Sequence, residues 1–201
     1  MADRDDVIDV TRPGHYGAAG SGVAIAEVSI AAAWNIQGDP TRASIIDTAR
    51  RLFNVALPTA PNTIAVTQQL TAIWLGPRSW LLASGGDSQL VDFTAKRGAL
   101  NAAGGALFDV SASRVGWRVS GTRATVVLAK HCPLDFHPRA FAANTCAQSL
   151  FGHVNALFIK HDDMPTFTVM VARGFARDVF DALIASAAQY GVDVEPPGTL
   201  R

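Results

Sequence analysis

Residues 145–161, TCAQSLFGHVNALFIKH, contain two apolar stretches separated by the dipeptide Gly152-His153. Valine, isoleucine, phenylalanine and threonine are enriched in strands, and a two-residue connection with glycine is typical of a tight hairpin. A third stretch of the same kind, TFTVMVA (166–172), follows after a short connection. Strands joined by two-residue connections pair antiparallel. This part of the chain therefore predicts an antiparallel sheet.

The first half of the chain repeats this pattern around the turn Gly76-Pro77. Two strands, TIAVTQ (63–68) and TAIWLG (71–76), precede the turn, and WLLAS (80–84) leaves it. Proline presets the backbone for such a turn, and the flanking stretches are aromatic and aliphatic.

Two further segments complete the predicted sheets. The segment VAIAEVSIAAAWNIQ (23–37) alternates only loosely and predicts one long or bulged strand. The strand ALFDVSA (106–112) meets RVGWRVSG (114–121) across a very short connection, which favours a second antiparallel pair.

Helices are predicted between these groups of strands. Asp39 and Pro40 supply an N-cap and a first-turn proline for a helix that ends near Asn54. A second helix is predicted to start at a cap on Asp87. A third helix is predicted after Ser120-Gly121, and a fourth at about 175–190. The predicted inner face of the second helix consists of Leu90, Phe93, Thr94 and Leu100.

The order of these elements predicts an α+β fold. We expect mostly antiparallel sheets with helices packed on them, arranged as two split βαβ-like (ferredoxin-like) halves. The predicted boundaries are an extended N-terminal arm (1–22), a first half (23–105), a second half (106–192) and a tail (193–201).

Composition excludes several classes of protein. The 201 residues are 49% hydrophobic and 17% charged, and 17 basic residues balance 17 acidic ones. Disorder requires low hydrophobicity, and nucleic-acid binding requires a surplus of Lys and Arg. We also expect no transmembrane helix and no secretory signal peptide, and the two cysteines are consistent with free thiols in the cytoplasm. The low charge fits either a surface covered by a partner or an alanine-rich composition.

Motifs for chemistry are weak. No glycine-rich nucleotide loop and no C-x-x-C pair occur. His131 and Cys132 are adjacent, which is poor spacing for one zinc ion, and a helix C-terminus disfavours a Cys132 thiolate. Asp109 could act as a base or bind an amine, but its simpler role is to cap a turn through Ser111 and Ser113, or to pair with Arg114 or Arg118. We therefore expect this chain to hold no catalytic, cofactor-binding or metal-binding residue.

Four strings resemble the gamma-subunit family of bacterial heterotetrameric sarcosine oxidase. They are WLGPRSWLLA (74–83), FDVSASRVGWRVSGTRATVVLAKHCPLDFHPRAF (108–141), AQSLFGHVNALFIK (147–160) and FTVMVARGFARDVFDALIASA (167–187). The most specific is LAKHCPLDFHPRAF (128–141), which is similar to a family pattern of the form L-x-K-x-C-P-x-D-[LF]-H-P-R-x-F. The string from Asp109 to Gly121 is also similar to the folate-binding T-protein of the glycine cleavage system.

The resemblance implies an accessory subunit of an enzyme that oxidatively demethylates sarcosine to glycine. It implies alpha, beta and delta partner chains, with FAD, FMN, NAD and tetrahydrofolate in the partner chains and zinc in the delta chain. Hydrogen peroxide is the expected product of the electron transfer to oxygen, and the one-carbon unit passes to tetrahydrofolate. No cofactor is expected in this chain, and no nucleic acid or membrane is an expected partner.

Two alternatives remain open. The chain could serve a sister complex that oxidises another N-methyl amino acid, such as N-methylglutamate, or it could be a stand-alone folate-dependent aminomethyltransferase in which Asp109 orients the folate amine. For the accessory-subunit hypothesis, the expected partner contacts are in the 132–141 segment and the N-terminal arm. These residues are Cys132, Asp135, His137, Arg139, His15 and Tyr16.

Overall fold

The hairpin around Gly152 lies at the edge of the larger of two sheets in the computed structural model, which describes residues 12–85 and 92–200. Each sheet belongs to its own unit. One unit is Ile30–Ala112, and the other combines the chain before Ile30 with the chain after Ala112. Within the described ranges, no helix combines the length and apolar composition needed to cross a bilayer.

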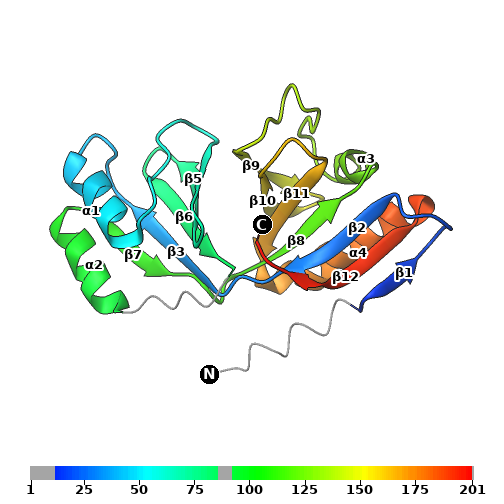
Figure 1. The fold of residues 1–201 in the computed structure, drawn as a ribbon, viewed down its shortest axis with the longest axis horizontal. Helices are drawn as coiled ribbons and strands as arrows, with labels where there is room; N and C mark the ends of the chain where they lie inside the picture. Colours follow the sequence, from blue (N-terminus) through cyan, green and yellow to red (C-terminus); the bar gives the residue numbers. More distant parts are fainter. Residues whose placement is uncertain (1–11, 86–91, 201) are drawn as a thin grey trace. The chain divides into compact units, whose positions relative to one another are not determined.

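The Ile30–Ala112 unit contains a five-stranded sheet in the order β4-β5-β6-β3-β7, and every neighbouring pair is antiparallel. Its helices α1 (Ala43–Phe53) and α2 (Phe93–Ala102) lie side by side (Figure 1). Phe53 and Leu100 from these helices share one core with Trp34 and Trp80 of the sheet. The strands are β3 (Ala32–Gln37), β4 (Ile64–Val66), β5 (Thr71–Gly76), β6 (Ser79–Ser84) and β7 (Ala106–Asp109).

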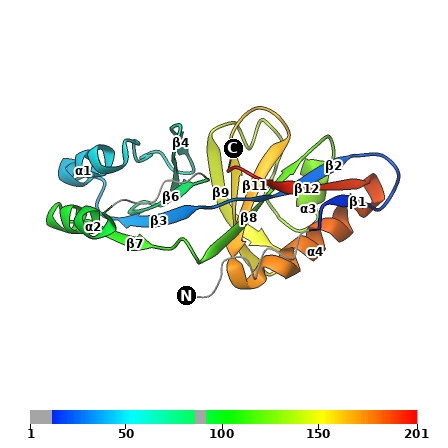
Figure 2. The same cartoon turned by 60° about the horizontal axis from the view of Figure 1, so that its bottom comes forward.

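The second unit contains a seven-stranded sheet in the order β1-β12-β2-β8-β11-β10-β9, and only the β12–β2 pair within the described chain is parallel. Helices α3 (Ala124–Ala129) and α4 (Ala176–Ala187) contribute Val127, Leu128, Val179 and Leu183 to a core with one face of this sheet (Figure 2). The strands are β1 (Gly14–Tyr16), β2 (Val23–Val28), β8 (Arg114–Ser120), β9 (Thr145–Phe151), β10 (Val154–Lys160), β11 (Thr166–Ala172) and β12 (Val192–Gly198).

The α+β class and the antiparallel hairpins are confirmed, but the boundary between the two halves is wrong. The predicted strand 23–37 is two strands, because β2 and β3 belong to different sheets. The Ser29 N–H donates to Gly198 O in one unit at 2.8 Å, and the Ala31 N–H donates to Ser84 O in the other at 2.8 Å. The chain therefore passes from one unit to the other at Ile30, in the middle of the expected strand.

The return crossing accounts for a second error. Strands β7 and β8 do not pair with each other as expected, although only a short connection separates them. The Val110 N–H donates to Ala33 O, and Ser113 O accepts from the Arg173 N–H, both at 2.9 Å. Backbone groups on the two sides of Ala112 are thus hydrogen-bonded in different units, so residues 23–105 and 106–192 are not the structural halves.

Parts of the predicted arm and tail form strands, which the sequence did not predict. The predicted tail becomes β12, which pairs with β1 of the predicted arm and with β2. Gly191 opens β12 at φ +72°, and a Cβ added there would lie 1.8 Å from Gly20 O. Only glycine accommodates this close approach, which brings the segment before β2 against the start of β12.

Helix starts differ from the predicted ones in both helices of the Ile30–Ala112 unit. Asp39 does not cap α1, because its Oδ1 accepts hydrogen bonds from Thr41 N at 3.0 Å and from Thr41 Oγ1 at 2.8 Å. The helix begins at Ala43, three residues after the predicted first residue Pro40. Asp92 caps α2 by accepting from Ala95 N at 3.2 Å. The predicted cap Asp87 and the predicted inner residue Leu90 lie outside the described residues.

Candidate functional site

The 132–141 segment connects α3 to β9 and is held by aromatic side chains. Phe136 and Phe141 are buried in the core of the seven-stranded unit. The Phe136 ring centroid lies 5.4 Å from that of Phe158 and 5.3 Å from that of Phe167, both edge to face. Phe141 stacks on Phe167 at 6.0 Å. These contacts fix the backbone of an otherwise irregular segment.

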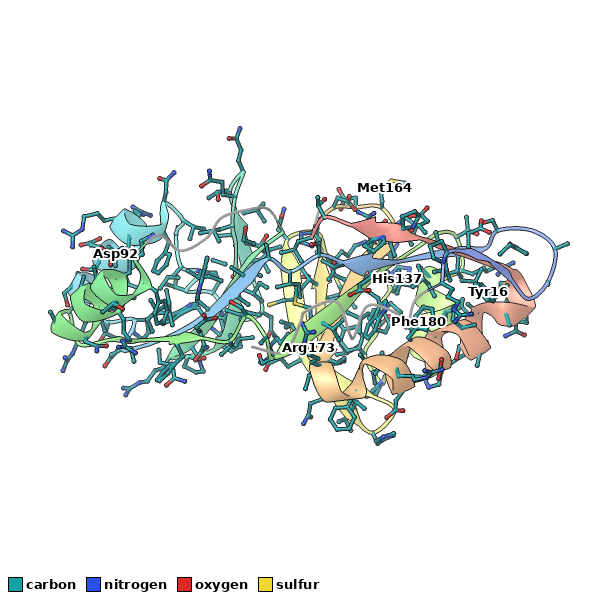
Figure 3. All side chains as sticks on the ribbon, turned by 90° about the horizontal axis from the view of Figure 1, so that it is seen from below. Tyr16, Asp92, His137, Met164, Arg173 and Phe180 are labelled. Carbon is teal, nitrogen blue, oxygen red and sulfur yellow. The ribbon has the colours of Figure 1, made fainter. Side chains whose placement is uncertain are left out.

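Polar residues of the same segment are exposed and ordered by the backbone. Asp135 Oδ1 accepts from His137 N at 2.8 Å, and His137 Nδ1 accepts from Arg139 N at 3.2 Å. A ring nitrogen that accepts a hydrogen bond carries no proton, so the neutral His137 ring has its proton on Nε2. The segment therefore presents two donors to solvent, the His137 Nε2–H and the Arg139 guanidinium. Figure 3 shows His137 among the side chains of this unit.

Cys132 does not share this exposure. It is 5% exposed and belongs to the core cluster, as a free thiol. The Cys132 side chain thus packs inward in the chain alone, and its expected contact with a partner stays a prediction. Its neighbour Pro133 is exposed and reaches a nearby hollow.

This hollow has a volume of about 490 Å³ and lies beside the edge strand β9. Its polar lining comes from three different strands, β8, β9 and β10. The polar side chains are Arg114, Gln148, Ser149 and Asn155. Its apolar lining consists of Pro133, Leu150, Ala156 and Leu157. Leu150 is 45% exposed, so a large apolar side chain faces solvent beside the hollow.

Arg114 is the only formally charged residue among the eight that line the hollow. Its side chain is partly buried, and this burial lowers the pKa of the guanidinium. The sequence left open a pair between Arg114 and Asp109. Asp109 instead accepts from Ser111 N at 2.9 Å and from Ser111 Oγ at 2.6 Å, so its expected turn-capping role is confirmed.

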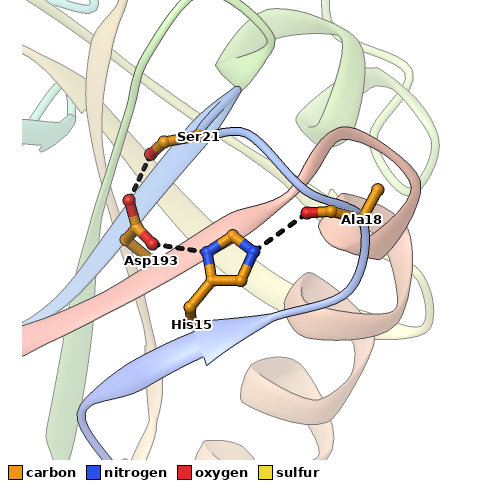
Figure 4. A network of polar contacts seen from close by, with 4 residues as sticks. All are labelled: His15, Ala18, Ser21 and Asp193. Atoms are coloured by element: carbon orange, nitrogen blue, oxygen red, sulfur yellow. Dashed lines mark hydrogen bonds and ion pairs between the residues drawn. The ribbon is translucent and has the colours of Figure 1, made fainter.

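His15 forms a hydrogen-bond network where strand β1 pairs with strand β12 (Figure 4). His15 Nδ1 lies 2.7 Å from Asp193 Oδ1, and His15 Nε2 lies 2.9 Å from Ala18 O. Both ring nitrogens thus face acceptors, which only the doubly protonated ring satisfies. The bond to Asp193 and then the Ala18 carbonyl raise the pKa of His15.

The same network contains a serine but not the geometry of a nucleophile. Ser21 Oγ donates to Asp193 Oδ2 rather than to the histidine, and His15 Nε2 is occupied by the Ala18 carbonyl. A catalytic serine needs its base within hydrogen-bond reach. The bond from Ser21, followed by that from His15, lowers the pKa of Asp193. These residues therefore fasten β1 to the sheet.

Tyr16, the second arm residue expected at an interface, is partly buried. Its ring packs against the core of the seven-stranded unit, and its hydroxyl donates to Arg12 O at 2.8 Å. Tyr16 and His137 are both labelled in Figure 3. The structure thus shows His15 and Tyr16 in contacts within the chain, and leaves Asp135, His137 and Arg139 at the surface.

The remaining histidines and thiols do not assemble into a site. His131 Nε2 hydrogen-bonds Ser186 Oγ, and the His131 ring stacks near Phe151, so it links the end of α3 to α4. Cys146 is buried in β9. Within residues 12–85 and 92–200, no three His, Cys, Asp or Glu side chains are grouped as metal ligands.

The hollow is the feature that sequence reasoning missed. Arg114 was noted only as a possible partner of a nearby carboxylate, because the sequence does not show that β8 and β10 are two strands apart in one sheet. The nearest sequence signal was the arginine at the start of the strand RVGWRVS (114–120).

Comparison with known sequences places these features in a family. The sarcosine oxidase subunit gamma of Corynebacterium sp. (strain U-96) is 36% identical over 137 residues, which is 68% of this chain and 65% of the relative. The sarcosine oxidase subunit gamma of Arthrobacter sp. is 31% identical over 143 residues, 70% of this chain and 68% of the relative. The matched region thus spans about two thirds of these relatives.

Solved structures show the same fold. A chain of the heterotetrameric sarcosine oxidase from Corynebacterium sp. U-96 in complex with pyrrole 2-carboxylate matches with a TM-score of 0.77 at 25% identity. The match covers 87% of this chain and 88% of that chain. The glycine cleavage system aminomethyltransferase T from Bartonella henselae matches 98% of this chain and 52% of its own, with a TM-score of 0.56 and 12% identity. This second likeness concerns the fold alone.

The family model described as sarcosine oxidase, gamma subunit family matches residues 37–189. These residues include the aromatic-anchored 132–141 segment and all eight residues that line the hollow. The chain belongs to the sarcosine oxidase gamma subunit family.

Proposed function

We propose that this chain is an accessory subunit of a multi-subunit flavoenzyme that oxidatively demethylates sarcosine to glycine. The observation that supports this proposal most strongly is the match of the gamma-subunit family model over residues 37–189. The fold of a chain from a heterotetrameric sarcosine oxidase, similar over 87% of this chain, supports it independently. The partners in this proposal are alpha, beta and delta chains of that complex.

The role of the chain in this complex is mainly structural. FAD, FMN, NAD and tetrahydrofolate are held by the partner chains and zinc by the delta chain, in this proposal. The exposed donors His137 Nε2 and Arg139 suit contact with another polypeptide. The His137 ring needs little further ordering on binding, because its Nδ1 already accepts from the Arg139 N–H. Asp135 supports this presentation rather than making the contact, since its carboxylate is engaged with the His137 N–H.

A reducing, cytoplasmic location is part of the same proposal. Cys132 and Cys146 are both free and both buried. Unpaired buried thiols are typical of compartments where disulfides do not form.

Co-expression with the three companion chains tests the proposal. With a tag on this chain, the alpha, beta and delta chains are expected to co-purify in fixed proportion, and the complex is expected to consume sarcosine and release hydrogen peroxide. A parallel assay with N-methylglutamate identifies the substrate. Turnover of N-methylglutamate alone would reassign the complex, and failure of the companions to co-purify would contradict the subunit role.

A further inference from the structure

The Arg114 side chain lacks the compensation that a partly buried charge normally has. Within the described ranges, no carboxylate lies within ion-pair distance of its guanidinium, and no hydrogen bond or ring contact engages it. Removing a guanidinium from water without such partners costs free energy. The nearest acidic residue along the chain before it, Asp109, is engaged with Ser111. We therefore expect Arg114 to lower the stability of the free chain.

The strand register places a second polar side chain across the hollow. Arg114 of β8 lies opposite Ala172 of β11, and Ala156 of β10 lies opposite Val171 of β11. By the same register, Asn155 faces Ala172 on its other side. Adjacent strands are about 4.8 Å apart, so Arg114 and Asn155 backbones lie about 10 Å apart with only an alanine methyl between them. That gap leaves room for a planar group of carboxylate size.

The hollow lies beside the edge strand β9, and its exposed lining includes apolar as well as polar side chains. Asn155 is paired with Leu150 of the edge strand β9, and Leu150 is 45% exposed. Pro133, from the aromatic-anchored segment, also lines the hollow and is exposed. Arginine next to exposed apolar side chains is common at the energetically important centre of a protein interface.

We propose that this hollow receives an aspartate or glutamate side chain from a partner polypeptide. The carboxylate accepts two parallel hydrogen bonds from the Arg114 guanidinium, and an apolar residue of the partner covers Leu150. A polypeptide is favoured over a free acid because the charge and the exposed apolar surface occur together. This inference rests on the proposed subunit role and specifies one of its contacts.

Binding to the companion chains, assembled without this subunit, tests the inference. The variants are Arg114→Met, which keeps the aliphatic stem, and Arg177→Met as a matched control on an exposed arginine of α4. Arg114→Met is expected to weaken the Kd by about 30-fold or more, as for loss of one member of a desolvated charge pair. The control is expected to change the Kd by less than about threefold, as for an exposed ion pair.

Two measurements on the free chain keep the outcomes distinguishable. The Tm of Arg114→Met is expected to equal or exceed that of the original chain, because an uncompensated charge is removed; a lower Tm would indicate a structural role and overturn the inference. A Tm increase in 10 mM acetate that Arg114→Met abolishes would indicate a small-acid site instead. Unchanged companion binding by Arg114→Met would overturn the inference and leave the subunit role intact, whereas no binding by the original chain would contradict the subunit role.

Discussion

Phe136→Ala provides the strongest test of how the 132–141 segment is held. Phe136 is 3% exposed and contacts the Phe141, Phe158 and Phe167 rings. Truncation of a buried phenylalanine costs about 3–5 kcal/mol. We expect about 3 kcal/mol here, at the low end, because an irregular segment can collapse partly into the space. For a chain of this size, that loss lowers the Tm by about 6–12 °C.

Urea unfolding followed by circular dichroism measures the loss, and peptide-level hydrogen exchange assigns it to one unit. Protection is expected to fall in the seven-stranded unit and to stay unchanged in Ile30–Ala112. Phe175→Ala is the matched control, since Phe175 is 42% exposed and should lose less than about 1 kcal/mol. Equal losses in the two variants would refute the reasoning that aromatic packing anchors the segment.

Three further predictions concern His15, Gly191 and Asp109. The His15 pKa is raised above its usual 6.5 and the Asp193 pKa is lowered below 3.8. Attachment of β1 is therefore expected to be complete below pH 6.5, to weaken as pH rises through the folded pKa of His15, and to weaken again in acid as Asp193 is protonated. NMR titration of the His15 ring and hydrogen exchange of β1 measure this pH dependence. Hydrogen exchange of β1 that does not change with pH would contradict the prediction. A His15→Gln variant should lose the transition near neutral pH. Gly191→Ala is expected to lower the free energy of unfolding by about 1–3 kcal/mol, because it places a Cβ against the Gly20 carbonyl at positive φ. Urea unfolding measures this loss. An unchanged free energy of unfolding would show that the segment before β2 is free to move. Asp109→Ala is expected to lower the free energy of unfolding by about 1 kcal/mol, because the hydrogen bonds to Ser111 are lost. Calorimetry with tetrahydrofolate on the original chain is expected to show no binding. Tight binding that Asp109→Ala abolishes would support the aminomethyltransferase alternative.

Local sequence signals predicted the parts of the fold that depend on neighbouring residues. The β9–β10 hairpin follows from Gly152, which adopts φ +60°, and the β5–β6 hairpin follows from the Gly76-Pro77 turn. The helix predicted at about 175–190 is also confirmed as α4, which buries Val179, Leu183 and Ala187. In each case the hydrogen-bonding partner is a few residues away, so composition and spacing suffice.

Errors arose where the partner is distant along the chain. Apolar and polar residues alternate in the same way in a strand that stays in one sheet and in a segment that crosses to another sheet. The local sequence therefore does not show that the chain changes units at Ile30 and at Ala112. The C-terminal strand was missed for the same reason, since Val192 pairs with Val23 and with Tyr16, more than 160 residues away.

Some features of the candidate site also follow from the local sequence, and others depend on distant residues. The surface positions of Asp135, His137 and Arg139 agree with a loop rich in polar residues, whereas the burial of Cys132 depends on the aromatic core behind it. The hollow beside Arg114 depends on the register of β8, β11 and β10, which only the folded sheet reveals. Whether these surfaces contact partner chains stays a prediction.

Native mass spectrometry of the co-expressed chains tests the central claim most directly. If this chain is an accessory subunit, the tagged preparation should contain one copy of it with one copy each of the alpha, beta and delta chains. Recovery of this chain alone, from cells in which the other three chains assemble with one another, would contradict the account.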